Sequence, residues 1–111
     1  MRLPEIIDRL SLSVLTPALG FDSDVTGGYC GDLLSHVLAK ATKGDLWITI
    51  QHHANVVAVA QVAGIAAILI VDGRLPSEET LARAKDGKIV LLGTTESAFA
   101  IAARLHTLLA T

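Results

Sequence analysis

The residues best suited to chemistry lie in one stretch, Asp24–Gly28, which Tyr29–Asp32 follows directly. These nine residues include three glycines and two carboxylates. Glycine backbone can adopt positive φ or let another group approach closely, and Thr26 and Asp24 can hydrogen-bond nearby amides. The stretch therefore predicts either a bulged strand or tight turn, or a cradle for a phosphate or carboxylate.

The same stretch resembles the signature of the DRTGG domain, with Val25 where the family has an arginine. The resemblance extends over nearly the whole chain and includes Asp32–Ser35, Gly44–Thr49, His52, Asn55 and Val57–Ala60. Such domains lie beside the catalytic domain of HPr kinase/phosphorylase, in some phosphotransacetylases, and between CBS domains in certain pyrophosphatases. The resemblance implies an accessory regulatory module like the N-terminal domain of HPr kinase. Valine at position 25 removes a cation that could contact an anion.

The elements that must position these residues alternate between strands and helices. We expect helices over Leu3–Leu10, Asp32–Ala41, Asn55–Ala63, Ser77–Gly87 and from Thr94 or Thr95 to about Leu109. We expect strands over Leu12–Leu15, Val25–Cys30, Leu46–Ile50, Ala66–Val71 and Ile89–Leu92. Asp32 is the expected cap of the second helix, which would bury Leu33, Leu34, Val37, Leu38 and Ala41. The alternation predicts one α/β domain over residues 1–111, a three-layer sandwich with a mostly parallel sheet.

Ligands of open parallel sheets bind beyond the carboxyl ends of the strands, where three polar loops are expected here. These loops are Gln51–Asn55, Asp72–Arg74 and Gly93–Thr95. Their side chains and helix N-termini suit a carboxylate or phosphate, although the same residues could simply cap helices and close turns. The candidate ligand-binding residues are Asp24, Thr26, Gly27, Gly28, Gln51, His52, Asn55, Asp72, Arg74, Thr94 and Thr95.

His52 and His53 are adjacent, so we expect their rings to point apart, and no metal-ligand spacing accompanies them. We therefore predict no metal and no cofactor. His106 is expected to interact with the C-terminal dipole of the last helix. The sequence lacks a phosphate-binding loop, since Gly87–Lys88 has no earlier glycine at the required spacing, and it lacks GxGxxG and GxSxG motifs. Kinase activity is therefore not carried over from the resemblance.

Composition limits the possible partners. Of the 111 residues, 51% are hydrophobic and 18% are charged, a charged fraction below that of a typical domain, which predicts a homo-oligomer that hides part of its surface. The net charge of −2, with scattered basic residues and few aromatics, argues against nucleic acid. The uncharged run Ala54–Val71 is broken by Asn55, Gln61 and Gly64, so we expect no membrane span. The lone Cys30 suits a reducing cytoplasm, and Glu5 stands where a secretory signal would begin its apolar run, so we expect no export and a cytoplasmic protein.

Two functions of different classes follow from these observations. The first is a non-catalytic regulatory module, oligomeric, that binds a small anionic ligand or a partner protein along an edge formed by Thr26–Gly28 and Gln51–Asn55. The second is a small enzyme acting on an anionic metabolite, with His52 as its acid or base, paired with Asp32 or Asp72. A structural assembly subunit is a further alternative.

Overall fold

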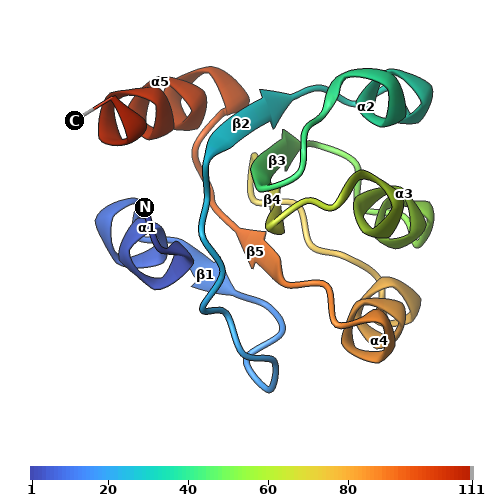
Figure 1. The fold of residues 1–111 in the computed structure, drawn as a ribbon. Helices are drawn as coiled ribbons and strands as arrows, with labels where there is room; N and C mark the ends of the chain where they lie inside the picture. Colours follow the sequence, from blue (N-terminus) through green and yellow to red (C-terminus); the bar gives the residue numbers. More distant parts are fainter. Residues whose placement is uncertain (111) are drawn as a thin grey trace.

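A computed structural model describes residues 1–110 (Figure 1). Five helices and five strands alternate along most of this part of the chain. The helices are α1 (Leu3–Arg9), α2 (Leu34–Lys40), α3 (Asn55–Ala63), α4 (Glu78–Gly87) and α5 (Ala98–Leu109). The strands are β1 (Ser13–Val14), β2 (Gly27–Cys30), β3 (Asp45–Thr49), β4 (Ala67–Ile70) and β5 (Leu91–Gly93).

The strands form a single five-stranded sheet in the order β1-β5-β4-β3-β2. The strands β2 to β5 are parallel to one another, and only β1 is antiparallel to its neighbour. Because the chain steps along the sheet in one direction, crossovers of one hand place α2, α3 and α4 on the same face. The helices from the two ends of the chain, α1 and α5, cover the other face (Figure 1). The predicted three-layer α/β sandwich is confirmed.

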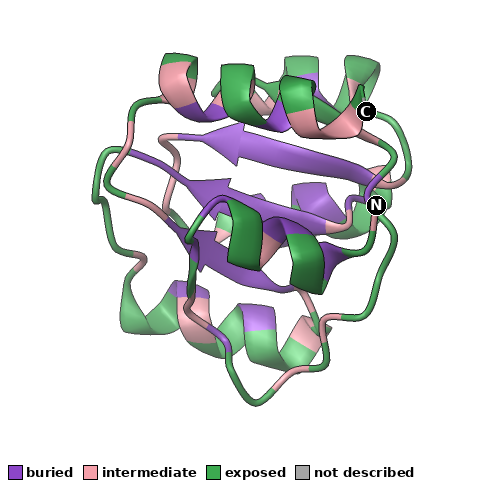
Figure 2. Cartoon of the chain, turned by 90° about the vertical axis from the view of Figure 1, so that its left-hand side faces the viewer, coloured by how far each residue is buried: buried purple, intermediate pink, exposed green. Residues whose placement is uncertain are grey.

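The sheet is buried on both faces, and each face has its own hydrophobic core (Figure 2). Every residue of β3, β4 and β5 is buried. Such near-continuous apolar strands are the expected pattern for a parallel sheet between two helical layers. Leu46 and Leu69 pack beneath α1 and α5, whereas Trp47 and Ile68 pack beneath α2, α3 and α4.

Two of the predicted helices have the expected ends. Helix α3 spans Asn55–Ala63 and ends at Gly64, whose φ of 70° is left-handed. Helix α4 begins after Ser77, whose side chain accepts a hydrogen bond from the amide of Thr80. Both ends follow from local chemistry, since glycine tolerates the left-handed conformation and serine caps free amides.

The prediction for α2 was wrong in its cap and in part of its buried face. Leu33, not Asp32, stands at the N-cap, and no side chain caps the helix. Val37 is fully buried, but Leu33 and Leu38 are 66% and 47% exposed. The Asp32 carboxylate instead accepts hydrogen bonds from Thr49 and Ile50 at the end of β3. The short helix buries Val37 fully in the core.

Strand β2 is a regular parallel strand, so the predicted bulge or tight turn at Gly27 and Gly28 is wrong. Its register with β3 runs one to one from Gly27–Asp45 to Cys30–Ile48, and neither Gly27 nor Gly28 has positive φ. These two glycines are required for space. A Cβ on Gly27 would lie 2.8 Å from Oδ1 of Asp45, and one on Gly28 would lie 2.9 Å from Cδ2 of Leu105.

We expect Gly27→Ala to destabilise the protein by about 1–3 kcal/mol, because the added methyl group is driven against a buried carboxylate. Asp45 is only 6% exposed, and its Oδ2 is held by the amide and hydroxyl of Thr42 at 2.8 and 3.2 Å. Gly20→Ala is the matched control, since nothing lies within 4 Å of its added Cβ. Urea denaturation of both variants measures the difference, and equal stabilities would contradict the steric explanation.

Candidate functional site

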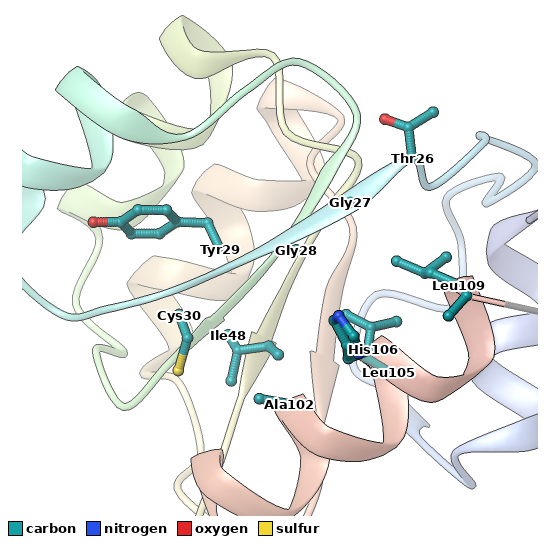
Figure 3. A pocket seen from close by; sticks show the side chains of 11 residues that line it. Thr26, Gly27, Gly28, Tyr29, Cys30, Ile48, Ala102, Leu105, His106 and Leu109 are labelled. Atoms are coloured by element: carbon teal, nitrogen blue, oxygen red, sulfur yellow. The ribbon is translucent and has the colours of Figure 1, made fainter.

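A groove of about 420 Å³ lies between β2 and the C-terminal half of α5 (Figure 3). It is lined by Thr26, Gly27, Gly28, Tyr29, Cys30, Ile48, Ala102, Leu105, His106, Leu109 and Ala110. The middle of the β2 side is bare backbone at Gly28, with the side chains of Thr26 and Cys30 at either end. The groove therefore combines apolar walls with a hydroxyl, an imidazole and strand backbone, an arrangement that suits a small ligand with a flat apolar part.

Helix α5 is capped at its N-terminus and is joined to α1 from its middle. Ser97 caps the first turn by accepting a hydrogen bond from the amide of Ala100 at 3.2 Å. Arg104 pairs with Glu96 and also donates to the carbonyl of Arg9 at 3.2 Å, which joins α5 to the end of α1. The prediction that Thr94 or Thr95 caps this helix was wrong, because residues 94–96 fold into a turn in which Thr94 Oγ1 accepts from the amide of Glu96 at 3.2 Å.

A second polar cluster lies at the carboxyl ends of β2 and β3, centred on Asp32. Its Oδ1 accepts hydrogen bonds from Thr49 Oγ1 at 2.8 Å and from the amide of Ile50 at 2.9 Å. Gln51 Nε2 donates to the Asp32 carbonyl at 3.0 Å. These bonds tie the loop after β2 to the loop after β3, so Asp32 and Gln51 are occupied by the protein itself.

His52 and His53 stack on each other, with ring centroids 4.8 Å apart, so the prediction that adjacent rings point apart was wrong. The carbonyl of His52 accepts a hydrogen bond from Thr80 Oγ1 at 2.9 Å, which fixes the loop against α4. Nδ1 of His52 is buried without a hydrogen-bond partner. Within residues 1–110, no carboxylate is hydrogen-bonded to the His52 ring, so the structure does not form the predicted acid–base pair. Asn55 is exposed in the first turn of α3.

The remaining two carboxyl-end loops are joined by backbone hydrogen bonds. The amide of Asp72 donates to the carbonyl of Glu96 at 3.0 Å, and the amide of Gly73 donates to the carbonyl of Thr94 at 2.9 Å. The amide of Arg74 donates to the carbonyl of Val71 at 3.2 Å. These donors are therefore not free for an anion. The Arg74 side chain is exposed and forms no ion pair with any part of residues 1–110.

The predicted site residues fall into separate groups and do not form one binding edge. Strands β2 and β3 run parallel, so Thr26–Gly28 lies at the start of the strands and Gln51–Asn55 lies beyond their ends. Asp24 lies upstream of the groove and forms an exposed ion pair with Arg2 at 3.5 Å. The structure thus brings Thr26, Gly27 and Gly28 into the groove and leaves the other predicted residues outside it.

The helical wall of the groove was missed by the sequence analysis. Three of its residues are ordinary apolar residues of an amphipathic helix, namely Ala102, Leu105 and Leu109. For His106 the sequence predicted only an interaction with the C-terminal dipole of the helix. The apolar periodicity of α5 predicts a buried face, but nothing in it indicates that this face overlaps the glycines of β2.

Cys30 lies at the groove end nearest Asp32. Partial burial raises the pKa of its thiol, and the negative charge of Asp32 raises that pKa further. At neutral pH the thiol is therefore protonated, and Cys30 serves as a small, weakly polar lining residue.

Within residues 1–110, no group of three or more His, Cys, Asp or Glu side chains is placed to hold a metal ion. None of the helices in this part of the chain is both long enough and apolar enough to cross a membrane.

No protein-family model matches the sequence, and no curated protein matches it significantly. Among solved structures, the chain is similar to the CBS and DRTGG domains of the regulatory region of Clostridium perfringens pyrophosphatase, which was crystallised with its activator, diadenosine tetraphosphate. The alignment has a TM-score of 0.63 and 20% sequence identity, and it covers 94% of this chain but only 45% of that one. At this identity the likeness concerns the fold. The chain therefore has a DRTGG-like fold, as the resemblance of Asp24–Gly28 implied.

Proposed function

We propose that this protein is a non-catalytic regulatory module, cytoplasmic and oligomeric, that senses a small ligand in the groove between β2 and α5. The observation that carries the proposal is the groove itself, because it gathers Thr26, Gly27 and Gly28 around a hollow large enough for a small ligand. The fold supports the regulatory role, since it is shared with the regulatory region of a pyrophosphatase.

The apolar lining of the groove favours a ligand with a flat apolar part, and we propose that the polar, anionic part of the ligand lies outside this lining. The bare backbone at Gly28 and the apolar face of α5 offer a slot for a ring, as the wall residues Ala102 and Leu105 are both aliphatic. A phosphate attached to this ring would extend out of the open side of the groove toward solvent. A nucleotide meets this description, and the pyrophosphatase region is one whose activator is a dinucleoside polyphosphate.

The carboxyl-end loops are the competing position for an anionic ligand. Arg74 is their exposed cation, and the stacked His52 and His53 lie in the neighbouring loop. Against this position, the amides of Asp72 and Gly73 are already hydrogen-bonded within the protein. The groove is therefore the better of the two candidates.

A thermal-shift screen with diadenosine tetraphosphate, ATP, AMP, acetyl phosphate and pyrophosphate tests the proposal. A ligand present at 100 times its dissociation constant adds about 2.7 kcal/mol, which raises Tm by about 10 °C for a domain of this size. We expect a nucleotide to produce the shift and pyrophosphate alone to produce little. A screen in which no compound raises Tm would contradict small-ligand sensing.

Ala102→Phe locates the binding site of any ligand found, because the larger side chain fills the groove from the α5 side. Ala82→Phe is the matched control, since Ala82 is exposed on α4 in the opposite helical layer. We expect the ligand-induced shift to disappear in Ala102→Phe and to persist in Ala82→Phe. Retention of the shift in both variants, with its loss in Arg74→Ala, would move the site to the carboxyl-end loops.

A further inference from the structure

The groove between β2 and α5 has very little charge in its walls. Of the described residues that line it, none is an aspartate, glutamate, lysine or arginine, and only Tyr29, Cys30 and His106 have a titratable side chain. A phenol or a thiol can become an anion but not a cation. The imidazole of His106 is therefore the one group in these walls that can become positively charged.

His106 stands at the rim of the groove. Ala102, His106 and Leu109 follow one another at helical spacing along one side of α5, and Figure 3 shows the His106 ring between the other two side chains. Ala102 and Leu109 are half-buried, whereas His106 is exposed. The ring is thus placed where the apolar lining of the groove meets solvent.

The ring nitrogens of His106 are not used by the protein itself. In the part of the chain that the structure describes, the ring forms no hydrogen bond and no ion pair. Carboxylates in the flanking segments have cations of their own, since Asp24 pairs with Arg2 and Glu96 pairs with Arg104. The ring is therefore free to bind an anionic group from outside.

The groups that share the groove with His106 do not offer a competing charge. Strand β2 contributes Tyr29 and Cys30 as titratable groups, and β3 contributes only Ile48. The raised pKa of the Cys30 thiol keeps that side chain uncharged at neutral pH. His106 also lies in the last turn of α5, where the carbonyl ends of a helix repel an anion. An anion at this rim is thus attracted only when the His106 ring is protonated.

We propose that His106 determines the specificity of the groove for anionic ligands, by binding the phosphate of a nucleotide whose ring lies against Gly28. The inference rests on the proposed function and names the residue that recognises the anionic part of that ligand. In this arrangement the phosphate meets the exposed imidazole as it leaves the apolar lining.

The inference gives His106 a contribution to binding that depends on pH. Histidine changes charge between about pH 5 and 8, and only the imidazolium offers a positive charge together with two N–H donors. Charge-assisted hydrogen bonds of this kind are stronger than neutral ones. The contribution of His106 to nucleotide binding therefore grows as the pH falls through this range.

Two ligands that differ only in the phosphate test the assignment. AMP and adenosine present the same ring and ribose, so their dissociation constants are measured by calorimetry at about pH 5.5, where histidine is largely protonated. We expect His106→Gln to weaken AMP binding about tenfold, the effect of losing one charge-assisted hydrogen bond at an exposed site, and to leave adenosine binding unchanged. His36→Gln is the matched control, because His36 is an exposed histidine on α2, in the opposite helical layer.

The pH profile separates the charge of the ring from its shape. The phosphate of AMP itself titrates near about pH 6, so the measured quantity is the ratio of the AMP dissociation constants of His106→Gln and wild type, in which that ionisation cancels. We expect a ratio of about ten at pH 5.5 that falls to about one at pH 8. His106→Lys keeps a cation throughout and should bind AMP at pH 8 about tenfold more tightly than wild type does.

The contrary outcomes are distinguishable. Equal AMP affinities of wild type and His106→Gln at pH 5.5 would overturn the inference and leave the proposed function of the groove standing. A loss of adenosine binding as large as that of AMP would also overturn it, because His106 would then act on the ring or on the shape of the groove. If neither compound binds to wild type, the inference is overturned, and the thermal-shift screen alone decides whether another small ligand is sensed.

Discussion

The structure depends on one close contact, in which α5 packs onto the bare backbone of β2 at Gly28. Leu105 is 2% exposed and reaches so near Gly28 that no side chain fits there. On the other face of the same strand, the Asp45 carboxylate occupies the space beside Gly27. Two adjacent glycines let an edge strand be approached from both faces, and this brings the last helix of the chain over the sheet edge.

The contact also explains why the groove lies where it does. The crossover helices α2, α3 and α4 all occupy one face, so the other face is covered only by α1 and α5 from the two ends of the chain. Arg104 joins these two helices through the Arg9 carbonyl. Two helices leave part of the face beside the edge strand uncovered, and the groove forms there.

At the carboxyl end of the sheet, where open α/β folds commonly bind ligands, many of the polar groups are hydrogen-bonded to one another. Asp32, Thr49 and Gln51 satisfy one another, and the loops after β4 and β5 are joined through Asp72 and Gly73. These bonds hold the loops at that end of the sheet together. Polar groups that are already hydrogen-bonded within the protein offer little to a ligand, because binding would have to replace those bonds.

Much of the fold was determined by the sequence itself. The apolar strands after Gly44, Gly64 and Gly87, with helices between them, required a parallel sheet buried on both faces. These elements can be recognised from the sequence because capping and hydrophobic periodicity act over only a few residues. The tertiary structure alone decided that Gly28 receives Leu105 and that Asp32 binds Thr49. It also separated Thr26–Gly28 from Gln51–Asn55, which no local pattern reveals. These outcomes depend on strand order and register, which bring together residues that are far apart in the chain, and a single sequence carries no local signal for such contacts.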